Sequence, residues 1–277
     1  MTETATDKQK SDFLQKIRTY LDEKTKTPAL PLTFVPQKTG RLDSKIGGEP
    51  YLPPGFKYPT IDLAEKQSVD GDESQLVLLA QLNFETLPHL PDFPTTGILQ
   101  IYIDKNDDVY GINFDRYTEQ KGWRIVYHPT IEHDESKLQT PPPVVNYDNL
   151  PFEEEHLIVP GTILEEPLTN YDYRFGEIWE EQFESEASEL GLERYELAEE
   201  LFPDEAGFSH KLGGYPAFTQ DDPRSDEQYQ AHDVLLLQIN SDQKIMWGDV
   251  GIANFFISRD DLKACRFDRV MYNWDCS

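Results

Sequence analysis

The amino-acid sequence predicts an α+β protein in which two related, mostly antiparallel β units pack in one body with a few peripheral helices. Three observations predict this fold class. Short segments rich in β-branched, aromatic and leucine residues alternate with turn residues. Two segments have the apolar spacing of amphipathic helices, and three blocks of sequence recur in the same order in both halves of the chain. With 277 residues, 38% of them hydrophobic, the chain can build a sizeable core.

The first half is expected to begin with a helix and to continue as strands. Residues 6–24 are predicted to be helical, because Phe13, Ile17 and Leu21 recur at the spacing of a helical turn. Residues 28–59 hold seven prolines, which favour an extended, winding segment over a helix or a central strand. Strands are predicted for residues 76–84, 97–104, 109–114 and 123–128.

The second half is expected to repeat this order around a longer helix. A proline-stiffened connector at 131–151 comes first. Residues 177–202 are predicted to form one helix whose apolar stripe includes Trp179 and Phe183, although Gly191 weakens its middle. Strands are predicted for residues 234–240, 244–247, 251–258 and 267–272, with a short helix capped by Ser258 before the last strand.

The recurring blocks indicate an internal duplication. Residues 44–50 (SKIGGEP) correspond to 210–216 (HKLGGYP), residues 76–83 to 234–240, and residues 97–103 to 251–257. The offset falls from 166 to 154 residues, as expected if loops were shortened in the second copy. We therefore expect an N-terminal helix (1–27) and one domain (28–277) made of two pseudo-repeats, about 28–150 and 151–277.

The two glycine pairs within these blocks have two interpretations. Glycine supplies a positive φ or allows a close approach of two chain segments, and the proline that follows fixes the exit from the turn. Alternatively, two such loops brought together by pseudo-twofold symmetry present N–H groups to a ligand, as an anion nest does. The sequence leaves both interpretations open.

Polar residues in apolar surroundings provide the remaining candidates. Gln81 and Gln238 lie within apolar strands, where a buried amide must find partners; we expect ties to the Gly-Gly loop of the same unit, with ligand contact as the alternative. Asp249 either accepts backbone N–H bonds in its turn or lines a cleft between the repeats. The candidate ligand or groove residues are Gly47, Gly48, Gln81, Asn83, Gly213, Gly214, Gln238, Asn240, Trp247, Asp249, Asn254, Trp274 and Asp275.

The charge of the chain limits its partners. The formal net charge is −27, which disfavours nucleic acid and anionic membranes. Residues 1–138 carry 16 basic and 22 acidic groups, net −6, whereas residues 139–277 carry 9 and 30, net −21. Residues 177–205 contain 12 acidic groups and one basic group, Arg194. This segment is either a solvated helix face or a docking surface for a basic protein partner.

No motif for a cofactor, a metal or a catalytic group is recognisable, so we expect none. The six histidines have no metal-ligand spacing, and Val109 stands where a calcium loop beginning at Asp104 needs glycine. Cys265 and Cys276 are expected to be reduced thiols of a cytoplasmic protein. The sequence shows neither a membrane-spanning apolar stretch nor a secretory signal.

Several blocks resemble the YwqG family of bacterial proteins: KIGGEPYLP (45–53), LLAQLNF (78–84), FPTTGILQ (93–100), WGDVGIANFF (247–256) and YNWDC (272–276). The resemblance runs from about Pro28 to the last residue. It implies a cytosolic α+β domain of unknown function, with no established activity, cofactor or catalytic residue to transfer. Some members are encoded near toxin and immunity genes, which suggests a protein-binding role.

Two functional hypotheses follow from the sequence. The first is a cytoplasmic protein-interaction or binding module, of immunity type, that uses an acidic surface and binds a basic protein. The alternative is an enzyme or small-ligand-binding protein whose site is a polar groove between the repeats, and the lack of a catalytic motif favours the first. The sequence determines neither a ligand nor the oligomeric state.

Overall fold

The structure is a computed structural model that describes residues 5–61, 75–142, 149–202 and 207–277. Its described part contains five α-helices: α1 (Ala5–Lys24), α2 (Arg174–Gln182), α3 (Glu184–Leu190), α4 (Arg194–Leu201) and α5 (Arg259–Lys263). The strands are β1 (Thr27–Pro36), β2 (Lys45–Ile46), β3 (Val77–Asn83), β4 (Ile98–Ile103), β5 (Trp123–His128), β6 (His156–Pro160), β7 (Leu164–Glu166), β8 (Lys211–Gly213), β9 (Val234–Asn240), β10 (Ile252–Ile257) and β11 (Met271–Asp275). Short 3₁₀ turns are η2 (Glu135–Lys137), η3 (Pro223–Ser225), η4 (Glu227–Tyr229) and η5 (Phe267–Arg269).

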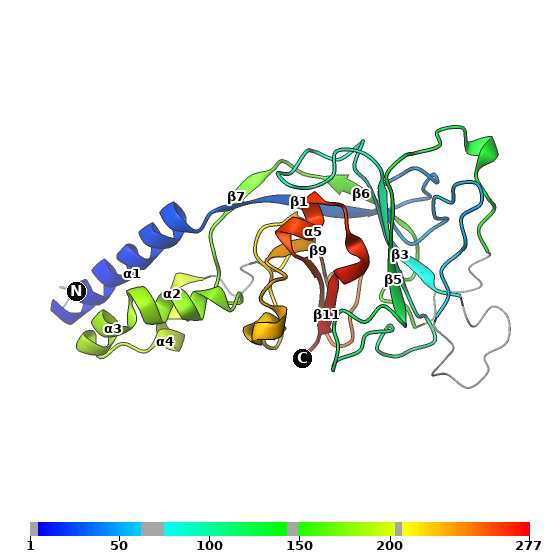
Figure 1. Ribbon diagram of the computed structural model, residues 1–277. Helices are drawn as coiled ribbons and strands as arrows, with labels where there is room; N and C mark the ends of the chain where they lie inside the picture. Colours follow the sequence, from blue (N-terminus) through cyan, green and yellow to red (C-terminus); the bar gives the residue numbers. More distant parts are fainter. Residues whose placement is uncertain (1–4, 62–74, 143–148, 203–206) are drawn as a thin grey trace.

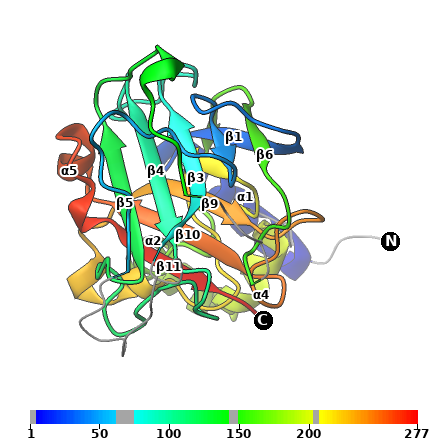
Figure 2. The same cartoon turned by 90° about the vertical axis from the view of Figure 1, so that its right-hand side faces the viewer.

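The strands form one large, curled antiparallel sheet, as the α+β prediction required. Its order is β11-β10-β9-β8-β1-β6-β2-β3-β4-β5, with β7 paired to β1 outside this path. The curl brings the two ends of the sheet face to face, so that β3, β4 and β5 lie across β9, β10 and β11 (Figure 2). The main core fills the space between them, and Trp123 lies 5.3 Å from Tyr272 and 6.2 Å from Phe255 between ring centroids.

The four longer helices lie together beside the β body rather than on it (Figure 1). We call α1 with α2, α3 and α4 the helical arm. It has its own core, in which Phe13 of α1 meets Trp179 and Phe183 edge to face at 6.3 and 6.2 Å. Burial of one such aromatic side chain contributes about 2 kcal/mol, more than the exposed ion pair between Lys16 and Glu186 provides. The arm is therefore held mainly by apolar packing.

Several predicted elements form as expected. The strands predicted at 123–128 and 234–240 have the same bounds in the structure, and Ser258 caps α5 by accepting a hydrogen bond from the N–H of Asp261. The first helix spans Ala5–Lys24. No helix in the described part of the chain is long and apolar enough to cross a membrane.

Other predicted elements differ, and each difference has a local cause. The single helix predicted at 177–202 is three helices, because α2 ends at Phe183 and Gly191 adopts a left-handed conformation (φ 69°) after α3. The strand predicted at 109–114 is a series of turns, because Tyr110 and Gly111 have φ of 55° and 80°. Residues 244–247 contribute only one bridge, between Ile245 and Phe152.

The proline-rich segment was predicted not to be a central strand, and this prediction was wrong. β1 lies in the middle of the sheet order. Its prolines supply carbonyl groups: Pro28 accepts from the N–H of Gly214 and Pro31 from the N–H of Gly161. A strand that divides its length among β6, β7 and β8 tolerates proline, because different partners pair with different parts of it. The last predicted strand, 267–272, forms later, as β11.

Candidate functional site

The two Gly-Gly loops adopt the same unusual backbone. Gly47 and Gly48 have φ of 65° and 72°, and Gly213 and Gly214 have φ of 67° and 69°. Successive left-handed residues are disfavoured for any side chain other than hydrogen. The glycines therefore serve the turn chemistry that the sequence predicted for them.

The protein's own carboxylates cover these loops. A Cβ on Gly48 would collide with the carboxylate of Glu155, and a Cβ on Gly214 with that of Glu166. The Glu166 Oε2 atom accepts from Lys211 Nζ at 2.8 Å and from the N–H of Tyr215 at 3.3 Å. An internal anion thus lies where the nest hypothesis places a ligand.

Gln81 ties β3 to the first Gly-Gly loop. Its amide nitrogen donates to the carbonyl groups of Arg41 and Asp43 at 2.9 and 2.8 Å. Its oxygen accepts from the N–H of Tyr51 and from Gln100 Nε2, both at 2.8 Å. Both donors and both lone pairs of the amide are used, so Gln81 has no hydrogen-bonding capacity left for a ligand.

Gln238 ties β9 to the second loop in the same way. Its nitrogen donates to the carbonyl groups of Gly207 and Ser209, each at 2.7 Å, and its oxygen accepts from the N–H of Ala217 at 2.8 Å. These partners lie four and two residues before Lys211 and six residues after it. The partners of Gln81 have the same offsets from the corresponding lysine in the first half.

The candidate asparagines also lie at these ties. Asn83 donates to the carbonyl of Leu42 at 2.8 Å, the backbone N–H of Asn240 donates to His210 Nδ1 at 3.1 Å, and Asn254 donates to the carbonyl of Ala217 at 2.8 Å. Asn83 and Asn254 are buried. All of these contacts hold loops to strands.

The candidates near the C-terminus include two tryptophans and two aspartates. Trp247 and Trp274 lie 6.0 Å apart between ring centroids, and Tyr110 is 5.3 Å from each. Asp249 is exposed, and its carbonyl accepts from the N–H of Ser277 at 3.1 Å. The structure therefore brings Trp247, Trp274 and Asp275 together, and β10 connects them to the Gln238 tie, because Asn254 pairs in register with Gln238 on β9 and with Asn273 on β11.

A cavity of about 320 Å³ opens beside this aromatic cluster. Its walls come from both halves of the chain: Phe114, Tyr117, Gln220, Asp221, Asp222, Pro223, Ser225, Asn273, Trp274, Asp275 and Cys276. We call it the C-terminal cavity. Asp275 accepts from the N–H and hydroxyl of Thr219 and from the N–H of Gln220. Burial nevertheless raises its pKa above the ordinary value, and the charge of Asp221 adds to the rise.

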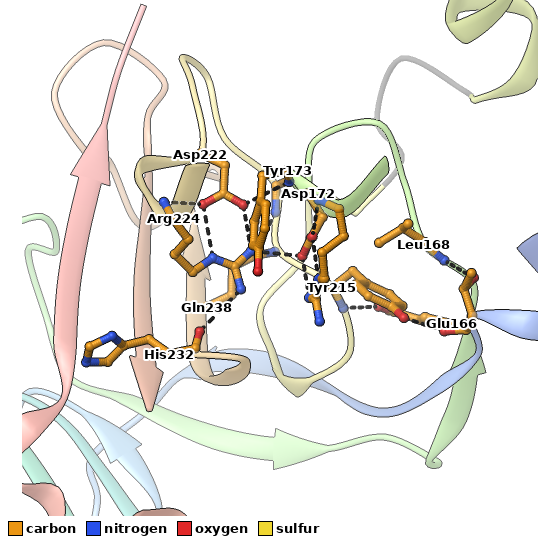
Figure 3. A network of polar contacts seen from close by, with 12 residues as sticks. Glu166, Leu168, Asp172, Tyr173, Tyr215, Asp222, Arg224, His232 and Gln238 are labelled. Atoms are coloured by element: carbon orange, nitrogen blue, oxygen red, sulfur yellow. Dashed lines mark hydrogen bonds and ion pairs between the residues drawn. The ribbon is translucent and has the colours of Figure 1, made fainter. Parts of the chain in front are cut away.

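A buried ion network borders the C-terminal cavity. Arg224 is fully buried and donates to Asp222 at 2.6 Å and to Asp172 at 2.8 Å. Its guanidinium lies 4.1 Å from the ring centroid of Phe256 and 5.5 Å from that of Tyr173. Figure 3 shows the guanidinium between the two carboxylates with the Tyr173 ring beside it. Burial opposes ionisation of Asp172, but the hydrogen bond from Arg174 and the charge of Arg224 hold its pKa below the usual value.

A second cavity of about 690 Å³ connects this network to the helical arm. It shares Gln220, Asp221, Asp222 and Ser225 with the C-terminal cavity, so one chain segment separates the two. Its other wall includes Tyr195 and Glu199 of α4, and Tyr195 is 66% exposed. The acidic helices and the Trp274–Asp275 region, separate candidates in the sequence, thus lie on adjoining surfaces.

Sequence analysis did not identify Asp172, Asp222 or Arg224. Only the setting of Arg224 within an otherwise acidic stretch, DDPRSDE (221–227), could have signalled an internal ion pair. A sequence does not show that Asp172, 52 residues away, reaches the same guanidinium. Among the described residues, no group of three or more His, Cys, Asp or Glu side chains is arranged to hold a metal ion.

Comparison with known proteins places the chain in a family. A family model described as "Domain of unknown function (DUF1963)" matches residues 44–276, and the chain belongs to this family. A search of curated proteins finds no match. The family match covers both Gly-Gly loops, both tie glutamines and the residues that line the C-terminal cavity.

Proposed function

We propose that this protein is a protein-binding module that docks a basic partner through its helical arm. The observation that carries the proposal is the outer face of α2, α3 and α4, which exposes glutamates around the 66%-exposed ring of Tyr195. The exposed glutamates of these helices are Glu177, Glu180, Glu181, Glu184, Glu189, Glu193, Glu196, Glu199 and Glu200. Of these, only Glu200 has a basic partner, Lys10, among the described residues.

This surface has the physical properties of a docking face. Its acidic field attracts a basic protein over a Debye length of roughly 8 Å at physiological salt, which raises the association rate. An exposed tyrosine supplies the apolar anchor that charges alone do not provide. The arm has a core of its own, so its outer face can change in charge without disturbing the sheet.

Charge reversal on the arm tests this function. In one variant Glu189, Glu193 and Glu196 become lysine; in a control of equal net charge the exposed Glu135, Glu153 and Asp268 of the β body become lysine. Fluorescence anisotropy with a labelled nona-arginine peptide at low and high salt reports binding. We expect the arm variant to lose most affinity at low salt and the control to lose much less. Equal losses would show that net charge alone binds the peptide and would reject the arm as the docking face.

One observation favours the alternative, a small-ligand-binding protein or enzyme. The C-terminal cavity is lined by residues of both halves of the chain, and Asp221 and Asp275 both line it. Paired carboxylates can serve as acid and base when their pKa values separate. A crystal structure with density for a small molecule in this cavity would favour the alternative.

We also propose that the chain is a YwqG-like cytoplasmic protein of immunity type, and that residues 28–150 and 151–277 are copies of one module within a single domain that follows the N-terminal helix. The matching offsets of the Gln81 and Gln238 ties support the duplication. So does a matched pair of strand contacts: Ile158 of β6 donates to the carbonyl of Ser44, and Leu32 of β1 donates to that of His210. In this arrangement the first strand of each copy pairs with a strand of the other copy.

A further inference from the structure

The C-terminal cavity is lined by aromatic rings and by polar groups without partners, and the proposed docking function does not by itself explain them. Phe114 is 49% exposed at its wall and lies 6.5 Å from Trp274 and 6.4 Å from Tyr117 between ring centroids. Phe114, Tyr117 and Trp274 all line the cavity, and the faces of aromatic rings attract cations.

Two of the three acidic groups that line the cavity, Asp221 and Asp275, lack a cation. Asp221 is exposed, and among the described residues neither Asp221 nor Asp275 has a basic partner. The nearest guanidinium, that of Arg224, is committed to Asp222 and Asp172. Burial raises the pKa of Asp275, and the charge of Asp221 raises it further.

A buried amide is also unsatisfied at this cavity. Asn273 is 4% exposed and lines the cavity, and its Nδ2 atom has no partner in the described structure. Asn254, its register partner on β10, has an unpartnered Oδ1. Leaving such groups unpaired costs about 1–3 kcal/mol each, and Asn273 is the one of the two that lines the cavity. Rotation of an amide by half a turn presents either its donor or its acceptor.

Another site in the same protein shows which chemical group aspartates and aromatic rings can bind together. The adjoining Arg224 site consists of two aspartates and two aromatic rings around one guanidinium. The C-terminal cavity repeats that combination with Asp221, Asp275 and its aromatic wall, but without the arginine. At about 320 Å³ the cavity is at the small end of ligand sites, which suits one side chain rather than a large cofactor.

We infer that the C-terminal cavity binds an arginine side chain of the protein that docks on the helical arm. The guanidinium stacks on Phe114 and Trp274 while Asp221 and Asp275 neutralise its charge. This inference rests on the proposed function, because it names the residue that the docked partner inserts. The two cavities share the wall formed by residues 220–225, so the helical arm and the C-terminal cavity belong to one continuous surface.

Two peptides and three variants test the inference. The peptides are a basic peptide with one central arginine and the same peptide with citrulline, its uncharged isostere, at that position. Asp221→Asn and Phe114→Ala alter the cavity, and Glu227→Gln is the control because Glu227 is an exposed acid outside the cavity. Isothermal titration calorimetry measures affinity, and thermal melting verifies that each variant is folded.

We expect the arginine peptide to bind the native protein at least roughly fivefold more tightly than the citrulline peptide, and each cavity variant to remove that preference. Glu227→Gln should retain it. A preference that persists in both cavity variants overturns the inference, as does the absence of any preference. A third outcome separates the two proposals: charge reversal on the helical arm abolishes peptide binding, while the cavity variants leave it unchanged. In that case the proposed docking function stands, and the inference that the C-terminal cavity binds arginine is wrong.

Discussion

The two halves of the sheet share a backbone arrangement but use different chemistry to hold it. In the first half Lys45 is fully buried and donates to the carbonyl groups of Gly40 and Glu49. In the second half Lys211 is also fully buried but forms an ion pair with Glu166 at 2.8 Å. The comparison teaches that the loop geometry can be kept while its electrostatics change, because the glutamine ties and not the charges fix the backbone.

The second half also contains the buried Arg224 network, in which one guanidinium is paired with Asp172 and Asp222. Together with the net charge of −21 in residues 139–277, this network makes the second half the chemically distinctive one. Both cavities discussed above adjoin it.

The largest effect is expected for Arg224→Met. The substitution leaves the carboxylates of Asp172 and Asp222 buried without their cation, which should lower the free energy of unfolding by about 3–5 kcal/mol. Urea denaturation followed by circular dichroism measures it. As a control, Arg116→Met removes an arginine whose side chain is 70% exposed and should change stability by less than about 1 kcal/mol. A loss as small as that of the control would show that the second half does not depend on its ion network.

A smaller, paired effect is expected at the Gly-Gly loops. Gly48→Ala and Gly214→Ala each force a left-handed alanine and displace a glutamate carboxylate from its hydrogen bonds, so each should cost about 2 kcal/mol. Gly55→Ala is the matched control: its φ is 76° but no atom lies within 4 Å of the added Cβ, so only the backbone strain of about 1 kcal/mol applies. Unfolding curves in urea provide the comparison. A large loss at only one of the two loops would break the equivalence of the halves.

The smallest effect is expected in the pH dependence of stability, which should differ between the two buried lysines, Lys45 and Lys211. Burial lowers the pKa of Lys45 from 10.5 to about 8, so between these values the unfolded chain binds more protons at this site than the folded chain. Stability of the native protein relative to Lys45→Met should therefore rise as pH increases through this window, by on the order of 1 kcal/mol. Below pH 8 the difference should stay constant, because the lysine is then protonated in both states.

The same measurement on Lys211→Met supplies the control. Burial lowers the pKa of Lys211 too, but the carboxylate of Glu166 opposes the shift. We expect a smaller rise with pH for this pair of proteins. Equal slopes in both halves would show that the carbonyl groups around Lys45 stabilise its charge as well as a carboxylate does, contrary to the comparison above.

Much of the fold could be predicted because it depends on local pattern. Alternating and apolar runs identify β5 and β9 at their observed bounds, and the hydroxyl of Ser258 identifies the start of α5. Positive φ and buried amides have few solutions, so turns and loop ties could be expected for the glycine pairs and glutamines, but ligand contact stayed open as the alternative until the structure showed their partners. β1 was missed as a central strand because proline content does not reveal that neighbouring strands share its length.

The sequence by itself therefore determined the fold class, the recurring blocks, the acidic second half and the residues that tie loops to strands. Each of these depends on residue type and on spacing over a few turns of chain. Only the tertiary structure placed Arg224 between Asp172 and Asp222, gathered the arm helices around one core, and opened a cavity between Phe114 and Trp274. The contacts of Arg224 with Asp172 and of Lys10 with Glu200 join residues 52 and 190 positions apart, and a sequence does not show such neighbours, because only the folded chain brings them together.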